Sequence, residues 1–245
     1  MAASDRPTVL LPVRVLQGES LPEGTPELLA NAHVVLLGYH LIPDQTATDQ
    51  AREQFGDRAM DKLDEFADTL SRAGADVDVR LVFTHEDQAT IDRVIYEEDC
   101  LAVLVPNAIA DLESVLVAIR GGVTLDRIAR LTAGLFADTD VEVVLYHVRG
   151  ESEDDADVET LLDDVLTRLV DYGLSPSSID TIIDAASEPM AKLSDRAESY
   201  DAVVMGETDP SVTTFVFGMP SDQIAERFLG PVLVVQRPRP DENSE

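Results

Sequence analysis

Short runs of Val, Ile and Leu alternate with longer amphipathic segments along the chain. Runs that are apolar at nearly every position are typical of parallel strands buried on both faces, whereas apolar residues three and four positions apart are typical of helices. In the C-terminal half the pattern predicts strands near 114–119, 141–148, 179–183, 201–206 and 231–236. It predicts helices at 123–137, from an acidic loop (151–157) to Tyr172, near 188–199 and near 220–229. This order predicts an α/β fold on a parallel sheet.

The N-terminal half follows the same plan but is shorter. Its strands are predicted near 8–15, 33–41, 77–83 and 101–105, with a long amphipathic helix at 48–73. The segment 22–32 contains two prolines and a glycine, so we expect a stunted helix there. Only residues 106–113 separate the fourth strand from the next one, so this half lacks the last helix and fifth strand.

The two halves therefore repeat one unit. Three pairs of segments match in the same order: 8–14 with 114–120, 34–40 with 141–147, and 102–105 with 202–205. The offset stays between about 100 and 107 residues, as expected of a tandem duplication. We predict two tandem open parallel-sheet α/β units at 8–110 and 113–238, the first truncated after its fourth strand, and a flexible tail at 239–245.

The most specific motifs lie at the end of the second unit. Val203-Val204-Met205-Gly206 ends a strand, Gly218 precedes a short helix, and the final strand begins Gly230-Pro231-Val232. A unit with these features resembles the universal stress protein (UspA-like) family, whose fold is also called adenine-nucleotide alpha-hydrolase-like. Two units in one chain resemble its tandem members, and the resemblance covers 114–237 and, more weakly, 8–107. It implies a regulatory, non-catalytic protein that acts in stress responses through protein contacts, and a homodimer formed through strand 231–236.

One branch of that family binds ATP through a Gly-x2-Gly-x9-Gly-(Ser/Thr) loop. Gly206 and Gly218 hold the first and third glycine positions here, but Asp209 replaces the second glycine and Pro210 follows it. A carboxylate repels a triphosphate, and proline has no backbone N–H to donate. The resemblance therefore implies no required cofactor, and ATP binding would use a degenerate motif.

Two interpretations of this region stay open. In the first, residues 206–218 are an ordinary strand-to-helix connection that packs on the sheet or on a partner. In the second, the unit is a nucleotide (ATP or AMP) or small-anion sensor, in which Arg120 and Gly121 supply a cation and a glycine turn beside Gly206, Asp209, Gly218 and Ser221. Family members that bind ATP carry Asp after the first strand, whereas this chain has Arg14 and Arg120 in its two units. No paired acid and base stands in these loops, so we expect no enzyme.

The charge of the chain limits the kinds of partner it can bind and indicates the environment in which it works. It has 48 Asp and Glu against 18 Lys and Arg, a formal net charge of −30, which excludes nucleic-acid and anionic-membrane binding. Its 44% hydrophobic residues provide a core, so disorder is not indicated. Lysine occurs only at Lys62 and Lys192, which is typical of a salt-adapted, haloarchaeal protein; a merely acidic protein is the alternative. With no leader-like segment and no long apolar run, we expect a cytoplasmic protein.

The remaining candidate groups have ordinary explanations. His40 and His147 end equivalent strands, and duplication of a strand-end residue explains their recurrence better than a paired site does. The acidic residues of 151–159 lack the glycine and spacing of a calcium loop, so we expect a solvated loop and no metal site. Cys100 has no partner for a disulfide and starts an apolar run, so we expect a core residue.

Overall fold

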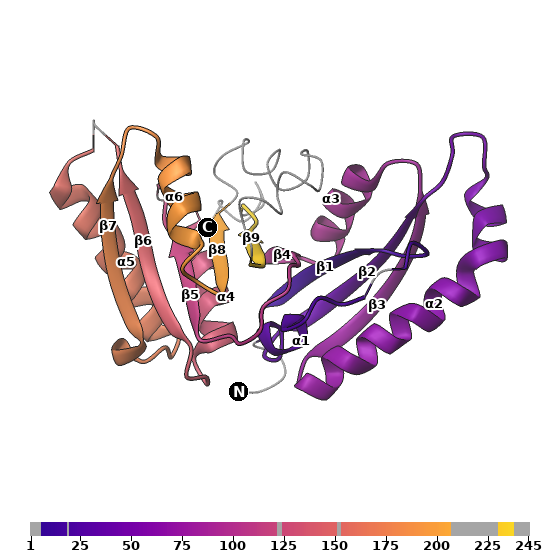
Figure 1. Ribbon diagram of the computed structural model, residues 1–245, viewed down its shortest axis with the longest axis horizontal. Helices are drawn as coiled ribbons and strands as arrows, with labels where there is room; N and C mark the ends of the chain where they lie inside the picture. The colour runs from indigo at the N-terminus through magenta and orange to yellow at the C-terminus, as the bar shows by residue number, and fades with distance from the viewer. Residues whose placement is uncertain (1–5, 19, 122–123, 151–152, 207–229, 238–245) are drawn as a thin grey trace.

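A computed structural model describes residues 6–18, 20–121, 124–150, 153–206 and 230–237. In this part of the chain nine strands form one sheet (Figure 1). The strands are β1 (Thr8–Arg14), β2 (His33–Leu41), β3 (Asp76–Thr84), β4 (Ala102–Val105), β5 (Ser114–Ala118), β6 (Glu142–Arg149), β7 (Ile179–Ala185), β8 (Ala202–Gly206) and β9 (Val232–Val235). Their order in the sheet is β3-β2-β1-β4-β9-β8-β5-β6-β7. The predicted α/β fold on a largely parallel sheet is confirmed.

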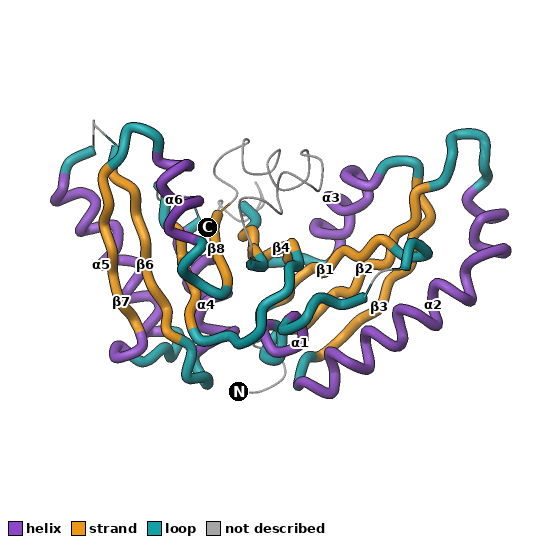
Figure 2. Tube along the Cα trace, viewed as in Figure 1, coloured by secondary structure: helices purple, strands orange, loops and turns teal. Residues whose placement is uncertain are grey.

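Helices cover both faces of this sheet. They are α1 (Thr25–Leu28), α2 (Thr48–Ala73), α3 (Asp87–Glu97), α4 (Leu125–Phe136), α5 (Asp155–Asp171) and α6 (Pro189–Ala197), with a 3-10 turn at Pro176–Ser178. Side chains of α1, α2, α4 and α5 share one buried cluster on one face, whereas α3 and α6 pack in separate clusters on the other. Figure 2 shows α3 and α6 on the same side, each over its own half of the sheet. The described residues contain no helix that is both long and apolar enough to cross a membrane.

The strand order is the same in both halves when each is followed from its outer edge. The first half runs β3-β2-β1-β4 and the second runs β7-β6-β5-β8-β9, with parallel pairing inside each. The halves meet where β4 pairs antiparallel with β9, and Leu104 lies opposite Leu233. β9 thus joins the strands of both halves into one continuous sheet.

This pairing corrects the expected role of strand 231–236. β9 pairs with β8 on one side and with β4 on the other, so its backbone has no open edge for a second chain. The prediction that this strand joins two chains is therefore wrong on this point, since the truncated first half uses it instead. A homodimer through another surface stays a prediction.

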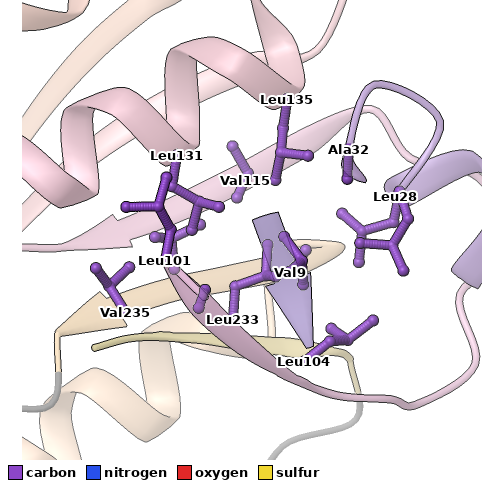
Figure 3. Close-up of a cluster of buried hydrophobic side chains, with 14 of the residues drawn as sticks. Val9, Leu28, Ala32, Leu101, Leu104, Val115, Leu131, Leu135, Leu233 and Val235 are labelled. Carbon is purple, nitrogen blue, oxygen red and sulfur yellow. The ribbon is translucent and has the colours of Figure 1, made fainter. Parts of the chain in front are cut away.

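A single hydrophobic core crosses the junction between the halves. Figure 3 labels ten of its side chains: Val9, Leu28, Ala32, Leu101 and Leu104 from the first half, and Val115, Leu131, Leu135, Leu233 and Val235 from the second. Polar contacts reinforce the same seam. The Asn31 side-chain amide donates to the Leu135 carbonyl at 2.9 Å, and the Arg127 guanidinium donates to the Cys100 carbonyl at 3.0 Å. α4 of the second half therefore packs on both halves.

Local sequence signals explain the ends of α2 and α5 and the shortness of α1. Gly74 follows α2 with φ 121° and Gly173 follows the end of α5 with φ 101°, a backbone region in which glycine is favoured. α1 has only four residues, as its prolines and glycine predict. α5 begins inside the predicted acidic loop, because the Asp154 carboxylate accepts a hydrogen bond from the Ala156 amide at 2.9 Å and caps the helix.

Candidate functional site

The candidate site lies at the carboxyl edge of the second half, where the chain order of the strands changes direction. β5 lies between β6 and β8: it is connected to β6 through α4 on one face of the sheet, whereas β8 is reached through α6 on the other face. Such a switch point is where open parallel sheets bind ligands. Arg120 and Gly121 follow the end of β5, and Gly206 ends the adjacent β8, with Met205 in register with Ala118. The structure thus brings these three predicted site residues to one edge.

The two glycines serve different purposes there. A Cβ atom on Gly206 would lie 2.6 Å from the hydroxyl of Thr124, the residue that precedes α4, so only glycine lets β8 end this close to the helix start. Gly121 has φ 68°, and among the described residues no atom lies within 4 Å of a Cβ position there. It therefore makes a left-handed turn. Gly206 supports packing, whereas Gly121 provides a backbone conformation that glycine favours.

A histidine and a glutamate complete the described part of this edge. His147, only 2% exposed, has Nδ1 2.9 Å from the Ile119 carbonyl and Nε2 3.2 Å from Oε2 of Glu153. The same Oε2 accepts the Gly150 amide at 2.7 Å. The Gly150 amide, the His147 ring and the charge of Arg120 together lower the pKa of Glu153, while partial burial opposes them. Glu153 is exposed, as expected of a solvated acidic loop, but its hydrogen bonds to His147 and Gly150 were not predicted.

The other predicted site residues, Asp209, Gly218 and Ser221, lie outside the described residues. The same is true of the helix predicted near 220–229. The described part of the site therefore consists of Arg120 and Gly121 with Gly206, Thr124 and the His147–Glu153 pair.

At the corresponding edge of the first half, the arginine pairs with side chains of the same half. Arg14 ends β1, and its Nη2 lies 3.2 Å from a carboxylate oxygen of Asp87, the first residue of α3. The guanidinium also lies over the Tyr39 ring, 5.8 Å from its centroid. His40 repeats the Nδ1 contact of His147, here 3.1 Å from the Val15 carbonyl, but its ring packs against aromatic side chains.

Arg14 and Arg120 are not fully equivalent. Measured from β4 and β8 they match, since Val9 pairs with Ala102 as Val115 pairs with Ala202. The register with the neighbouring strand on the other side differs by two residues. In the first half Tyr39 of β2 pairs with Arg14, whereas in the second half the equivalent Tyr146 of β6 pairs with Ala118, two residues before Arg120. A shift of two keeps the side chain on the same face of a sheet, but it carries Arg120 further beyond the strand end.

A polar network on the other face was not foreseen from the sequence. The buried Tyr146 donates its hydroxyl to Asp184 at 2.9 Å, and Arg196 lies over the Tyr146 ring and 3.9 Å from the Asp184 carboxylate. Burial and the hydrogen bond to Asp184 raise the pKa of the Tyr146 phenol. Lys192 approaches Asp184 at 3.8 Å. The network ties α6 to β6 and β7, and a raised phenol pKa does not favour a nucleophile.

Two further expectations can be compared with the described residues. Cys100 is buried, as predicted for a core residue. Within the described ranges, no group of three or more His, Cys, Asp or Glu side chains could hold a metal ion.

Solved structures with the same architecture extend over nearly the whole chain. A universal stress protein from Archaeoglobus fulgidus DSM 4304 has a TM-score of 0.63 at 17% identity and covers 94% of this chain and 96% of its own. A functionally unknown protein from Pseudomonas aeruginosa PAO1 has a TM-score of 0.53 at 15% identity, covering 95% and 93%. The cytoplasmic domain of a prokaryotic cation chloride cotransporter has 0.50 at 10%, covering 94% and 95%. No protein-family model matches the sequence, and no curated protein sequence matches it. The chain has the α/β fold of the universal stress proteins.

Proposed function

We propose that this protein is a non-catalytic regulatory protein of the universal stress type, whose second half binds a small phosphate-bearing ligand. The observation that carries the proposal is the arrangement at the switch point: Arg120 and Gly121 follow β5, directly beside the contact between Gly206 and the start of α4. The fold likeness to a universal stress protein supports the regulatory part. Because one fold serves many functions, the ligand is argued from the site alone.

The chemistry of this edge suits a phosphate group. A guanidinium donates paired hydrogen bonds to phosphate oxygens, and the first amides of α4 add unpaired N–H donors and a positive helix dipole. Glycine has no Cβ atom, so a ligand can approach the backbone at Gly121. The sequence also contributes Asp209, whose charge disfavours a triphosphate. AMP or inorganic phosphate is therefore the proposed ligand class, in preference to ATP.

The absence of catalysis is part of the proposal. Nucleophilic or acid–base catalysis requires a base that is available to a reacting group. At the described part of this edge the candidate base is His147, and both of its ring nitrogens already face acceptors. A regulatory protein that changes its contacts with a partner on binding needs no such base. The partner, a salt-adapted cytoplasmic setting and a homodimer stay predictions.

Isothermal titration calorimetry in about 2 M KCl tests the proposal, because screening at that salt removes most long-range repulsion from the −30 charge. We expect AMP or phosphate to bind with a Kd below about 1 mM. Arg120→Gln should weaken binding by about tenfold or more, as the loss of a charge-assisted hydrogen bond predicts. The matched control is Arg14→Gln, which should leave binding unchanged. No binding below millimolar concentration, or equal losses in both variants, would contradict the proposal.

A further inference from the structure

The sheet ends in two outer strands, β3 and β7, each of which has a paired strand on one side only. An outer strand directs every second N–H and C=O group away from the sheet, where these groups can bond a further strand. Proteins ordinarily cover or blunt such an edge. The two outer strands of this sheet differ in how they are covered.

The edge at β3 is covered by helix α2. The Asp76 amide bonds the Ala32 carbonyl at 3.0 Å, so alternate residues from Asp76 onward direct their backbone toward β2, and the residues between them face outward. The outward carbonyl of Leu81 has a partner, since the Arg52 guanidinium of α2 donates to it at 3.3 Å. Figure 1 shows α2 running alongside β3. The outward residues are half-buried or buried: Val77, Val79, Leu81 and Phe83.

The edge at β7 has no such cover. The Ala186 amide bonds the Arg149 carbonyl of β6 at 3.3 Å, so the residues that direct their backbone outward are Thr181, Ile183 and Ala185. Among the described residues, no strand or side chain bonds these outward groups. All three residues are exposed, with Ile183 at 42%, and α5 packs mainly against β6. β7 is therefore the open edge of the sheet.

We propose that β7 pairs antiparallel with β7 of a second copy of this chain, around a two-fold axis at Ile183. Ile183 then lies opposite Ile183 of the partner subunit, and Thr181 lies opposite Ala185 of the partner subunit. Each such pair exchanges two backbone hydrogen bonds. Because α2 covers β3, copies cannot add from β7 to β3 in an open chain, and a closed dimer uses the edge that remains. The dimer does not depend on the proposed ligand.

The charges on β7 select this register. With the axis at Ile182, Asp180 would lie opposite Asp184 of the partner subunit, and with the axis at Asp184 two such carboxylates would face one another. Like charges directly opposite are destabilising in a sheet. With the axis at Ile183, Asp184 lies opposite the partner's Ile182, and Asp180 lies opposite the partner's Ala186. No carboxylate of the strand then faces another.

One of the two carboxylates on β7 is also compensated within its own chain. Asp184 accepts the Tyr146 hydroxyl at 2.9 Å, and Lys192 and Arg196 lie 3.8 and 3.9 Å from it. Two cations beside one carboxylate offset its charge. Repulsion between two copies at this edge is thereby reduced.

The net charge makes the contact dependent on salt. Each copy carries −30, and at about 0.1 M salt the Debye length of about 10 Å leaves much of the repulsion in place. In about 2 M KCl this repulsion is screened. A single pair of strands is a small interface, so we expect a Kd on the order of 100 µM at that salt. Well below this concentration the chain is monomeric, and the stability of the single chain can be measured there.

Sedimentation velocity from about 5 to about 500 µM protein tests the dimer. In about 2 M KCl the mass should double toward the higher concentrations, and in about 0.1 M KCl the Kd should rise at least about tenfold. Ile183→Pro removes an N–H that points outward, so it removes no bond to β6 and should also raise the Kd at least about tenfold. Far-UV circular dichroism confirms that this variant is folded. A monomer at every concentration, or a dimer that Ile183→Pro leaves unchanged, would overturn the proposal.

A disulfide at the axis tests the register. Ile183→Cys sets two thiols opposite one another with Cα atoms about 5.5 Å apart, within the range of about 4.4–6.8 Å that disulfides span. The matched control is Asp180→Cys, at an exposed position whose two copies would lie about 20 Å apart along the paired strands. Cys100 is buried and does not compete. With oxidised glutathione, Ile183→Cys should form a covalent dimer and Asp180→Cys should not. Equal cross-linking of both variants, or of neither, would contradict the dimer.

Discussion

Leu233 tests how the two halves of the sheet are joined. It is fully buried in β9, lies opposite the equally buried Leu104 of β4, and belongs to the core that both halves share. Leu233→Ala removes buried methyl groups and leaves a cavity at the junction, which costs about 2–5 kcal/mol in well-packed cores. A domain is stabilised by about 5–15 kcal/mol in total, so this one change should remove a large share of the stability.

Urea unfolding in about 2 M KCl measures this loss. The chain has no Trp, so Tyr fluorescence and far-UV circular dichroism serve as probes of tertiary and secondary structure. We expect one transition by both probes, shifted to lower urea, because a shared core couples the halves. The matched control is Ile183→Ala on the outer strand β7, where the side chain is 42% exposed and the cost should stay below about 1 kcal/mol.

Light scattering on the same variant examines the role of β9. Because this strand is paired on both sides within the chain, the native particle should keep its mass. A halved mass with little loss of stability would mean that β9 joins two chains, and the reasoning from the structure would be wrong. Two separate unfolding transitions in the wild type would equally refute a common core.

Three other predictions concern single buried groups, helix ends and salt, and urea unfolding measures each. Thr132→Val should raise the unfolding free energy by about 1–2 kcal/mol, because the buried Thr132 hydroxyl has no hydrogen-bond partner among the described residues. The control, Thr90→Val, should lower the unfolding free energy by about 1 kcal/mol, because the Thr90 hydroxyl bonds Thr84 and Glu86. A loss in both would mean that Thr132 has a partner. Gly173→Ala should cost about 1 kcal/mol, because it places a side chain at φ 101° beyond the end of α5. Raising KCl from about 0.1 M to about 2 M should increase stability by screening the net charge of −30, and an unchanged midpoint would contradict the salt-adapted interpretation.

Elements with a strong periodic pattern could be predicted from the sequence almost to the residue. The strand His33–Leu41 and the helix Thr48–Ala73 have the predicted bounds, because burial on two faces and on one face leave different spacings of apolar residues. The stunted α1 followed from its prolines and glycine. These signals are local, because burial against the core repeats the same spacing of apolar residues along each helix or strand.

Pairings between distant segments could not be predicted in the same way. The repeat revealed that the first half lacks a fifth strand. An apolar run does not indicate which free strand edge it will pair with, so β9 was predicted to pair with a second chain, whereas it pairs with β4. Glu153 was missed because its bond to His147 spans a strand end and a loop, where side-chain spacing has no period. Tyr146 and Asp184 meet across neighbouring strands, which depends on register.

The difference between the halves is itself an argument for one ligand site. Each half carries an arginine near the end of its first strand, but the carboxylates beside them are used differently. Asp87 pairs directly with Arg14, so that cation is already neutralised. Glu153 bonds the Gly150 amide and His147, and the charge of Arg120 helps to lower its pKa. A phosphate at the edge of the first half would therefore displace this ion pair. The first half lacks a last helix and a fifth strand but keeps its other strands, as expected if it serves as a scaffold that completes the sheet.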